Sequence, residues 1–362
     1  MSTIFNNFFP GILKKWSRTR DGKDSEIQSG QQTSTIPNNL SPSRVTSIQS
    51  LADTGSASDQ ARYILAMQDS DPILSAHIQT RKLAVQSCQW IIENENPETA
   101  GALTDRMKKL GINALISHLL DAIPTGYAGA LQYWNSEGVS KWAMVHPSQF
   151  SFNSAGKPIV RSQMGTGVEL FGEFEAGTMI LYTPSSKPGI PSTQGLGRVL
   201  MTTWLRKQIA QMHLNRFLEK FGSPFRHIKM SNESYNDIKI REGVCMAARR
   251  MGNDGFAVTS EDTEIEFTSQ SQEGADSYFT QIQQCDNAYA LTLLGQLASS
   301  GEASGMSNGQ MQENVRNDIR DADCQGLTEC LTLQVLHPLE HFLFGTTDST
   351  FTLKSKQGMA DA

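Results

Sequence analysis

The chain has 362 residues, of which 38% are apolar and 19% charged, so it can form one large domain or about two to three small ones. Its formal net charge of −6 excludes a conventional nucleic-acid-binding protein, which is basic overall or carries a dense basic patch. The charge is uneven, because residues 1–50 hold six basic and three acidic side chains and the rest of the chain is acidic.

Cysteine usage and hydropathy narrow the class of protein further. The five cysteines form no CxxC pair, no long apolar run follows the N-terminus, and no stretch of roughly eighteen residues is apolar throughout. We therefore expect free thiols in a reducing cytoplasm, no secretory signal and no membrane-spanning segment. The cysteines are Cys88, Cys245, Cys285, Cys324 and Cys330.

The first fifty residues combine an aromatic start with a polar arm. Residues 4–13 are aromatic and apolar and lead into Lys14 and Lys15. We interpret them as a short helix docked on its own domain or on a neighbour, because Asn, Pro and Gly interrupt the apolar run that a membrane-surface helix needs. From about Gln28 to Ser50 the chain is rich in Ser, Thr, Gln, Asn and Pro without periodicity, which predicts a flexible arm.

The next segment, up to about residue 196, has the pattern of an α+β module. Apolar spacing predicts helices within 58–88, with a new start at Asp71 and Pro72, then a strand over 89–93 and one helix over 98–123. Residues 127–183 are rich in β-formers punctuated by Gly, Asn and Pro, as in hairpins. We expect strands at 130–134, 142–145, 150–152 and 179–182.

Long helices dominate the second half. A Pro/Gly-rich loop over 184–196 precedes a helix over 197–221, which would span roughly 37 Å. A small α/β unit follows, with strands at 226–230, 256–259 and 264–268 and a helix over 233–251. A second helix covers about 274–298, a small-residue loop 299–309, and a third helix 310–344, bent near Pro338, before a strand at 351–353.

Catalytic motifs are missing or stand in the wrong context. No GxxxxGK[ST] or HExxH motif occurs. Residues 305–309 match GxSxG, but a helix and small polar residues precede them instead of the strand that a nucleophile elbow needs. His337 and His341 share a helical face, yet we interpret them as packing and surface positions rather than zinc ligands. The scattered carboxylates indicate caps and solvated faces: Asp53, Asp59, Asp69, Asp71, Asp318, Asp321 and Asp323.

Three stretches together carry a resemblance to a known family. The first is Asp71-Pro72-Ile73-Leu74 through Arg81-Lys82 to Trp90. The second runs from Gly195-Leu196-Gly197-Arg198 through Trp204 and Lys207 to Gly222-Ser223-Pro224. The third is Leu294-Gly295-Gln296, the small-residue loop, and Val315 to Asp323. In order and spacing they resemble the portal proteins of tailed phages, specifically the Mu-like portal family.

The resemblance implies an α+β portal fold built from a wing, two stem helices, a clip and a tunnel loop, with a minimal or absent crown because few residues follow the last helix. It divides the chain as follows: N-terminal arm 1–50, wing 51–196, stem helix 197–221, clip 222–272, second stem helix 273–298, tunnel loop 299–310, long wing helix 311–344, and C-terminal strand and tail 345–362.

The implied function is that of a ring-shaped channel at a capsid vertex, not an enzyme, through which double-stranded DNA is packaged and ejected. The implied partners are identical copies, a dodecamer by analogy, with the terminase large subunit, the major capsid or scaffold protein and a head–tail adaptor. No membrane, metal or cofactor is implied. The implied localisation is the virion, after assembly in the host cytoplasm.

Residue-level expectations follow from this interpretation. A loop with one charged residue offers phosphates little to hold and lets DNA slide. The tunnel-loop candidates are Ser300, Gly301, Glu302, Ser304, Gly305, Ser307 and Asn308. The basic candidates on the first stem helix, which would pair with acids of a neighbour or face DNA, are Arg198, Arg206, Lys207, Arg216 and Lys220. In the clip, Ile265 and Phe267 would pair with a neighbour's sheet edge.

Two other functions compete with this one. A different head-assembly or adaptor protein would share the ring habit but lack two stem helices that bracket a clip. A DNA-processing enzyme, such as a nuclease or terminase-like factor, would need a carboxylate–metal cluster or a P-loop, and neither is evident in the sequence. An ordinary disordered connector is the alternative interpretation of residues 299–310.

Overall fold

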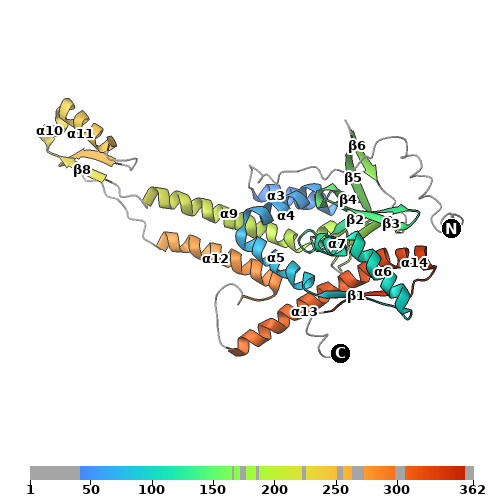
Figure 1. The fold of residues 1–362 in the computed structure, drawn as a ribbon. Coiled ribbons are helices and arrows are strands. Elements are labelled where there is room, and N and C mark those ends of the chain that lie inside the picture. Colours follow the sequence, from blue (N-terminus) through green and yellow to red (C-terminus); the bar gives the residue numbers. More distant parts are fainter. Residues whose placement is uncertain are drawn as a thin grey trace. The chain divides into compact units, whose positions relative to one another are not determined.

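The computed structural model describes residues 41–164, 167–171, 177–184, 187–221, 226–250, 256–262, 273–297 and 306–354 (Figure 1). The chain divides into two compact units. The larger unit comprises residues Met1–Trp204 and Asp286–Ala362, and the smaller one is Leu205–Cys285. Two helices, α9 (Leu196–Phe221) and α12 (Glu273–Leu294), each begin in one unit and end in the other.

The larger unit begins with three helices: α3 (Pro42–Asp53), α4 (Ser58–Ser70) and α5 (Pro72–Gln86). The prediction of a flexible arm up to residue 50 is wrong from Pro42 onward. The side chain of Ser41 accepts a hydrogen bond from the Arg44 backbone, and proline occupies the first helical position. The buried residues of α3 recur at helical spacing, although polar neighbours hide that period in the sequence: Val45, Ile48 and Ala52.

The helix predicted over 98–123 is three helices: α6 (Pro97–Leu110), α7 (Ile112–Leu119) and α8 (Ala122–Thr125). Gly111 separates the first two because it adopts the left-handed conformation, with φ +79°, that ends a helix. At the start of α6, the side chain of Asn96 accepts a hydrogen bond from the Glu98 backbone. The turn at Gly111 changes the direction of the chain, so α6 and α7 each pack an apolar face of their own.

All sheets of the larger unit are antiparallel. One has the order β3-β2-β7, with β2 Ala128–Asn135, β3 Gly138–Val145 and β7 Met179–Tyr182. The second has the order β4-β5-β6, with β4 Phe150–Phe152, β5 Pro158–Met164 and β6 Gly167–Phe171. In the third, β1 (Gln89–Glu93) pairs with β10 (Thr350–Lys354). Strands from the two separate chain segments of the larger unit therefore meet in one ladder.

The C-terminal helices are α13 (Met306–Leu331) and α14 (His337–Phe344), joined by the π-helical segment η4 (Thr332–Leu336). The sequence predicts a bend near Pro338, and the π segment ends two residues before that proline. Proline supplies no backbone donor and crowds the carbonyl four residues earlier, so a wider turn relieves the clash. The helix starts at Met306 and not at 310, so residues 306–310 of the predicted loop are helical.

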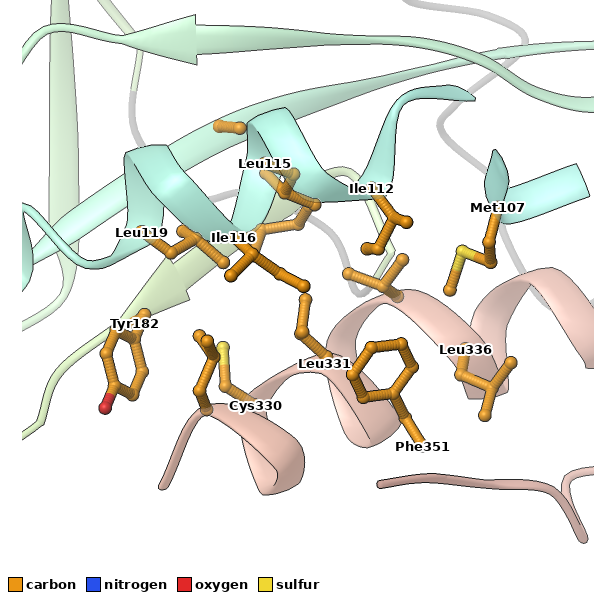
Figure 2. Close-up of a cluster of buried hydrophobic side chains, with 14 of the residues drawn as sticks. Met107, Ile112, Leu115, Ile116, Leu119, Tyr182, Cys330, Leu331, Leu336 and Phe351 are labelled. Carbon is orange, nitrogen blue, oxygen red and sulfur yellow. The ribbon is translucent and has the colours of Figure 1, made fainter. Parts of the chain in front are cut away.

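The main core forms where α7 and the C-terminal segment face each other. Figure 2 shows side chains of α7 pointing toward those of α13, η4 and β10. Phe351, from β10, is fully buried and stacks on Trp90 of β1 with ring centroids 5.8 Å apart. The labelled core residues of the two sides are Met107, Ile112, Leu115, Ile116 and Leu119 against Tyr182, Cys330, Leu331, Leu336 and Phe351.

The smaller unit contains a strand–helix–strand motif. Strands β8 (Arg226–Met230) and β9 (Phe256–Ser260) are parallel, and α10 (Asn232–Asn236) and α11 (Ile238–Arg250) connect them. The helix predicted over 233–251 is broken at Asp237, whose carboxylate accepts hydrogen bonds from the backbone of Lys239 and Ile240 and so starts α11. In the same unit His213 of α9 stacks on Tyr278 of α12, with ring centroids 6.2 Å apart.

Phe351→Ala is expected to destabilise the larger unit by about 3–5 kcal/mol, because it removes a fully buried ring from the core. Thermal and denaturant unfolding would measure the change. Thr350→Ala, at the exposed neighbouring position of the same strand, is the matched control and should change stability by less than about 0.5 kcal/mol. Equal effects of the two substitutions would show that the core does not depend on this ring.

Candidate functional site

The end of α12 packs directly against α13. Gly295 ends α12 in the left-handed conformation, with φ +69°, and its N–H donates to the Leu291 carbonyl at 3.1 Å. A Cβ on Gly295 would lie 3.0 Å from Val315 Cγ1 and 3.1 Å from Ile319 Cδ1. The last turn of α12, residues 291–295, and residues 315–323 of α13 therefore form one junction, which we call the loop base because it lies where α12 ends.

Arg81 of α5 holds this loop base together. Its Nε and Nη2 donate to the two carboxylate oxygens of Asp323 in α13, at 2.7 and 2.8 Å, and its Nη1 donates to the Leu293 carbonyl in α12, at 3.1 Å. The bidentate geometry and the low exposure of the two side chains, 16% and 6%, make this a charge-assisted contact shielded from water. One guanidinium thus connects three helices that are remote in sequence.

Tyr182 of β7 lies close enough to Arg81 and Asp323 to be influenced by their charges. Burial, and then the negative charge of Asp323, raise the pKa of Tyr182 well above its usual value. Its hydroxyl lies 3.2 Å from the position of a Cβ on Gly326 of α13, so a larger residue there would displace the ring. Tyr182 therefore packs in its neutral form against α13.

Two further arginines lie beside Arg81 at the loop base. Arg320 donates to the carboxylate of the exposed Asp321 at 2.8 Å and to Asn317 at 3.0 Å. Arg316 is exposed and has no ion-pair partner among the residues that the structure describes. The surface beside the loop therefore carries one uncompensated guanidinium, which sequence reasoning did not single out because α13 is also rich in acidic residues.

The basic candidates on α9 have different environments. Arg198 is engaged inside the larger unit: it pairs with Asp53 at 2.8 Å and donates to Gln60 and to the Gln49 carbonyl at 2.9 and 3.2 Å. Lys207 is buried, with 4% exposure. Arg206 and Arg216 are exposed, and the side chain of Lys220 lies outside the described residues. Only Arg206 and Arg216 thus present a described, exposed charge.

The other site candidates fall mostly outside the described residues. Residues 300–305 of the tunnel-loop set, and Ile265 and Phe267 of the clip, belong to that part of the chain. Ser307 and Asn308 are an exception, because their backbone forms the first turn of α13. The assignment of these two residues to a loop is therefore wrong, since the chain becomes helical from Met306 onward.

The described residues supply no metal centre. They contain no group of three or more His, Cys, Asp or Glu side chains that could hold an ion. His337 is hydrogen-bonded to the Ser349 carbonyl at 3.0 Å, and Asp71 caps α5 by accepting from the Ile73 and Leu74 backbone, as its position in the sequence predicts. Among the described helices, none is both long and apolar enough to cross a bilayer.

Arg81→Ala is expected to cost about 3–5 kcal/mol of stability, because it leaves the Asp323 carboxylate buried without a partner. Unfolding monitored by circular dichroism would measure it. Arg320→Ala is the matched control and should cost less than about 1 kcal/mol, since its partner Asp321 is 63% exposed. Arg81→Met combined with Asp323→Leu should recover most of the loss, and an Arg81→Ala protein of unchanged stability would contradict this view.

Comparison with known proteins points to one family. The family model described as portal protein of Mu bacteriophage matches residues 63–359. The portal protein of Escherichia phage Mu is 23% identical over 346 residues, which cover 88% of this chain and 64% of that protein. The Mu-like prophage FluMu protein gp29 of Haemophilus influenzae is 25% identical over 321 residues, which cover 83% and 60%. The chain thus spans less than two thirds of the length of these relatives.

Solved structures show the same fold at low sequence identity. A chain in the neck of an empty gene transfer agent particle has a TM-score of 0.55 at 11% identity, over 90% of this chain and 88% of that one. A crystal structure of an HK97-family phage portal protein from Corynebacterium diphtheriae has a TM-score of 0.50 at 11% identity, over 85% and 98%. With its mixed helices and sheets, and with a family model that matches well over half of its residues, the chain belongs to the portal protein family of Mu bacteriophage.

Proposed function

We propose that copies of this chain assemble into a ring at a capsid vertex and that double-stranded DNA passes through its central channel during packaging and ejection. The observation that carries the proposal is the order of elements: α9, a small strand–helix–strand unit, α12, a short loop and α13. In this assignment α9 and α12 are the stem helices, residues 222–272 the clip, and residues between α12 and α13 the tunnel loop. The wing is formed by residues 51–196 together with α13 and α14.

The opposite charges of the two stem helices support ring assembly. Helix α9 contains five Lys or Arg residues and one acidic residue, Glu219, whereas α12 contains three acidic residues and no Lys or Arg. In a ring, α9 of one copy faces α12 of the next, so their charges attract. Arg206 and Arg216 on α9, and Asp276 on α12, are exposed and therefore available for such contacts.

A channel for DNA has to guide the duplex without binding it tightly. Each phosphate that a protein cation neutralises releases counterions and adds affinity, so a densely basic lining would stall transport. The predicted tunnel loop contains one charged residue, Glu302, and the arginines at its base are neutralised by Asp323 and Asp321. Arg316 is the exposed cation beside the loop that we assign to a weak phosphate contact.

The remaining partners follow from this function. The clip would face the terminase large subunit during packaging and a head–tail adaptor afterwards, and the wing would contact the major capsid or scaffold protein. Twelve copies are the expected ring size, and the host cytoplasm is the expected place of assembly. The pairing of Ile265 and Phe267 with a neighbour's sheet edge stays a prediction.

Ring formation can be tested directly on the purified chain. Native mass spectrometry and negative-stain microscopy are expected to show a ring with a central hole, and a monomer or compact dimer would contradict the proposal.

The charges on the stem helices can be tested by reversal. Arg206→Glu with Arg216→Glu should raise the protein concentration needed for ring assembly at least tenfold. Lys108→Glu with Lys109→Glu, an equal charge change on exposed α6 positions, should leave that concentration unchanged. Adding Asp276→Lys should restore part of the assembly. The same mass measurement on Ile265→Pro with Phe267→Pro tests the clip pairing.

The tunnel loop can be tested separately from assembly. Replacing residues 299–305 by a Gly-Ser pair, with α13 left intact from Met306, should preserve the ring but reduce packaged DNA or its retention at least tenfold. Packaged genome per particle, measured by DNase-protected DNA, is the readout. A substitution of Glu302→Gln is the conservative control. Loss of the ring itself would show that these residues are a packing element and not a guide for DNA.

A further inference from the structure

Two buried thiols lie side by side where α5 meets α13. Cys88 follows the end of α5 and Cys324 lies in α13, 236 positions apart in sequence. Their sulfur atoms are 3.5 Å apart, within a thiol–thiol hydrogen bond, and the two residues are 9% and 5% exposed. The Cys88 thiol also donates to the Ala84 carbonyl in the last turn of α5, at 3.6 Å.

The neighbouring ion pair holds the two sulfur atoms in register. Asp323, next to Cys324, binds Arg81, which lies about two helical turns before Cys88. Disulfide formation requires a sulfur–sulfur distance of about 2.05 Å, so the atoms must approach each other by roughly 1.5 Å. Closing this distance requires the two side chains to rotate toward each other.

One of the two cysteines borders a groove that is open to solvent. Cys88 is among the residues that line a groove of about 730 Å³ between β1, the end of α5 and helices α6 and α7. The groove is partly polar, with Gln86, Lys108 and Asn113 in its wall. Lys108 in this wall would attract a small anionic disulfide such as oxidised glutathione toward Cys88, whereas Cys324 is not among the lining residues.

We propose that Cys88 and Cys324 form an oxidisable pair, converted by a small-molecule disulfide into a covalent link between the end of α5 and α13. The Cys88 thiolate attacks oxidised glutathione and releases one glutathione thiolate, which takes up the proton that Cys88 lost. Cys324 then attacks the Cys88 sulfur of the mixed disulfide and releases the second glutathione. Two protein thiols are oxidised and one glutathione disulfide is reduced to two thiols.

The significance of this link rests on the proposed function. Disulfides are disfavoured in a reducing cytoplasm but persist in virions outside the cell, so the ring would assemble with free thiols and become linked afterwards. Burial, and then the neighbouring Cys88, raise the pKa of the Cys324 thiol well above its usual value. The thiolate is the attacking species, so the second step is slow at neutral pH and accelerates as the pH rises.

Peptide mapping of the assembled wild-type chain is the direct test. After incubation with oxidised glutathione at pH 8.5, mass spectrometry without reductant should identify a peptide pair joined through Cys88 and Cys324, more slowly formed at pH 7. Cys88→Ala and Cys324→Ala should abolish that pair. Cys330→Ala is the matched control, because Cys330 is also buried in α13 but its sulfur faces the Leu181 carbonyl at 3.7 Å.

Thermal unfolding tests whether the link stabilises the fold. The oxidised wild-type chain and Cys330→Ala should melt on the order of 5 °C above their reduced forms, whereas Cys88→Ala and Cys324→Ala should show no such rise. Mixed disulfides with glutathione alone, or an equal rise in Cys324→Ala, would overturn the proposal. Native mass spectrometry of the same samples reports ring assembly independently, so a failure of the proposed function is seen as missing rings and not as a missing cross-link.

Discussion

The guanidinium of Arg81 is the contact on which the geometry around the loop base depends. It pairs with the buried Asp323 carboxylate in α13. It also donates a hydrogen bond to the Leu293 carbonyl at the end of α12, where the last carbonyl groups lack helical partners. A lysine could not make these three contacts at once, because its ammonium is a point charge without the planar fork of arginine. Since a buried ion pair is costly to desolvate, such a contact specifies an arrangement more than it adds stability.

The arrangement that it specifies is the relation between α5, α12 and α13. Gly295 allows the end of α12 to approach α13 closely, because a Cβ at that position would lie 3.0 Å from Val315 Cγ1 and 3.1 Å from Ile319 Cδ1. Cys330 and Leu331 of the same helix belong to the core shown in Figure 2, together with Leu336 and Phe351. The residues between Gly295 and Met306 carry one charged side chain, Glu302. In the proposed channel, such a low charge would limit the binding of this segment to DNA phosphates.

The portal fold is retained here at 11% identity to solved relatives, which shows how little of it depends on particular side chains. Many different combinations of apolar residues can fill one core if total volume and patterning are kept. The charges on α9 and α12 concern the association of copies and not the fold of one chain. They do not define the fold, but they would decide which helices meet when copies associate, because opposite charges steer and align partner surfaces.

The sequence by itself determined the α+β class, the long helices α9 and α12, the strand at Gln89–Glu93 and the family, because helical periodicity, proline and glycine positions and element order are local signals. The tertiary structure decided the rest. That α3 is a helix depends on burial of Val45 and Ile48 by distant residues, and the break at Gly111 depends on two packed faces. Asp323, which the sequence places among scattered acids, is a buried ion-pair partner only because α5 lies beside α13. Contacts between residues about 240 positions apart leave no periodic trace in either segment, so only the folded chain reveals them.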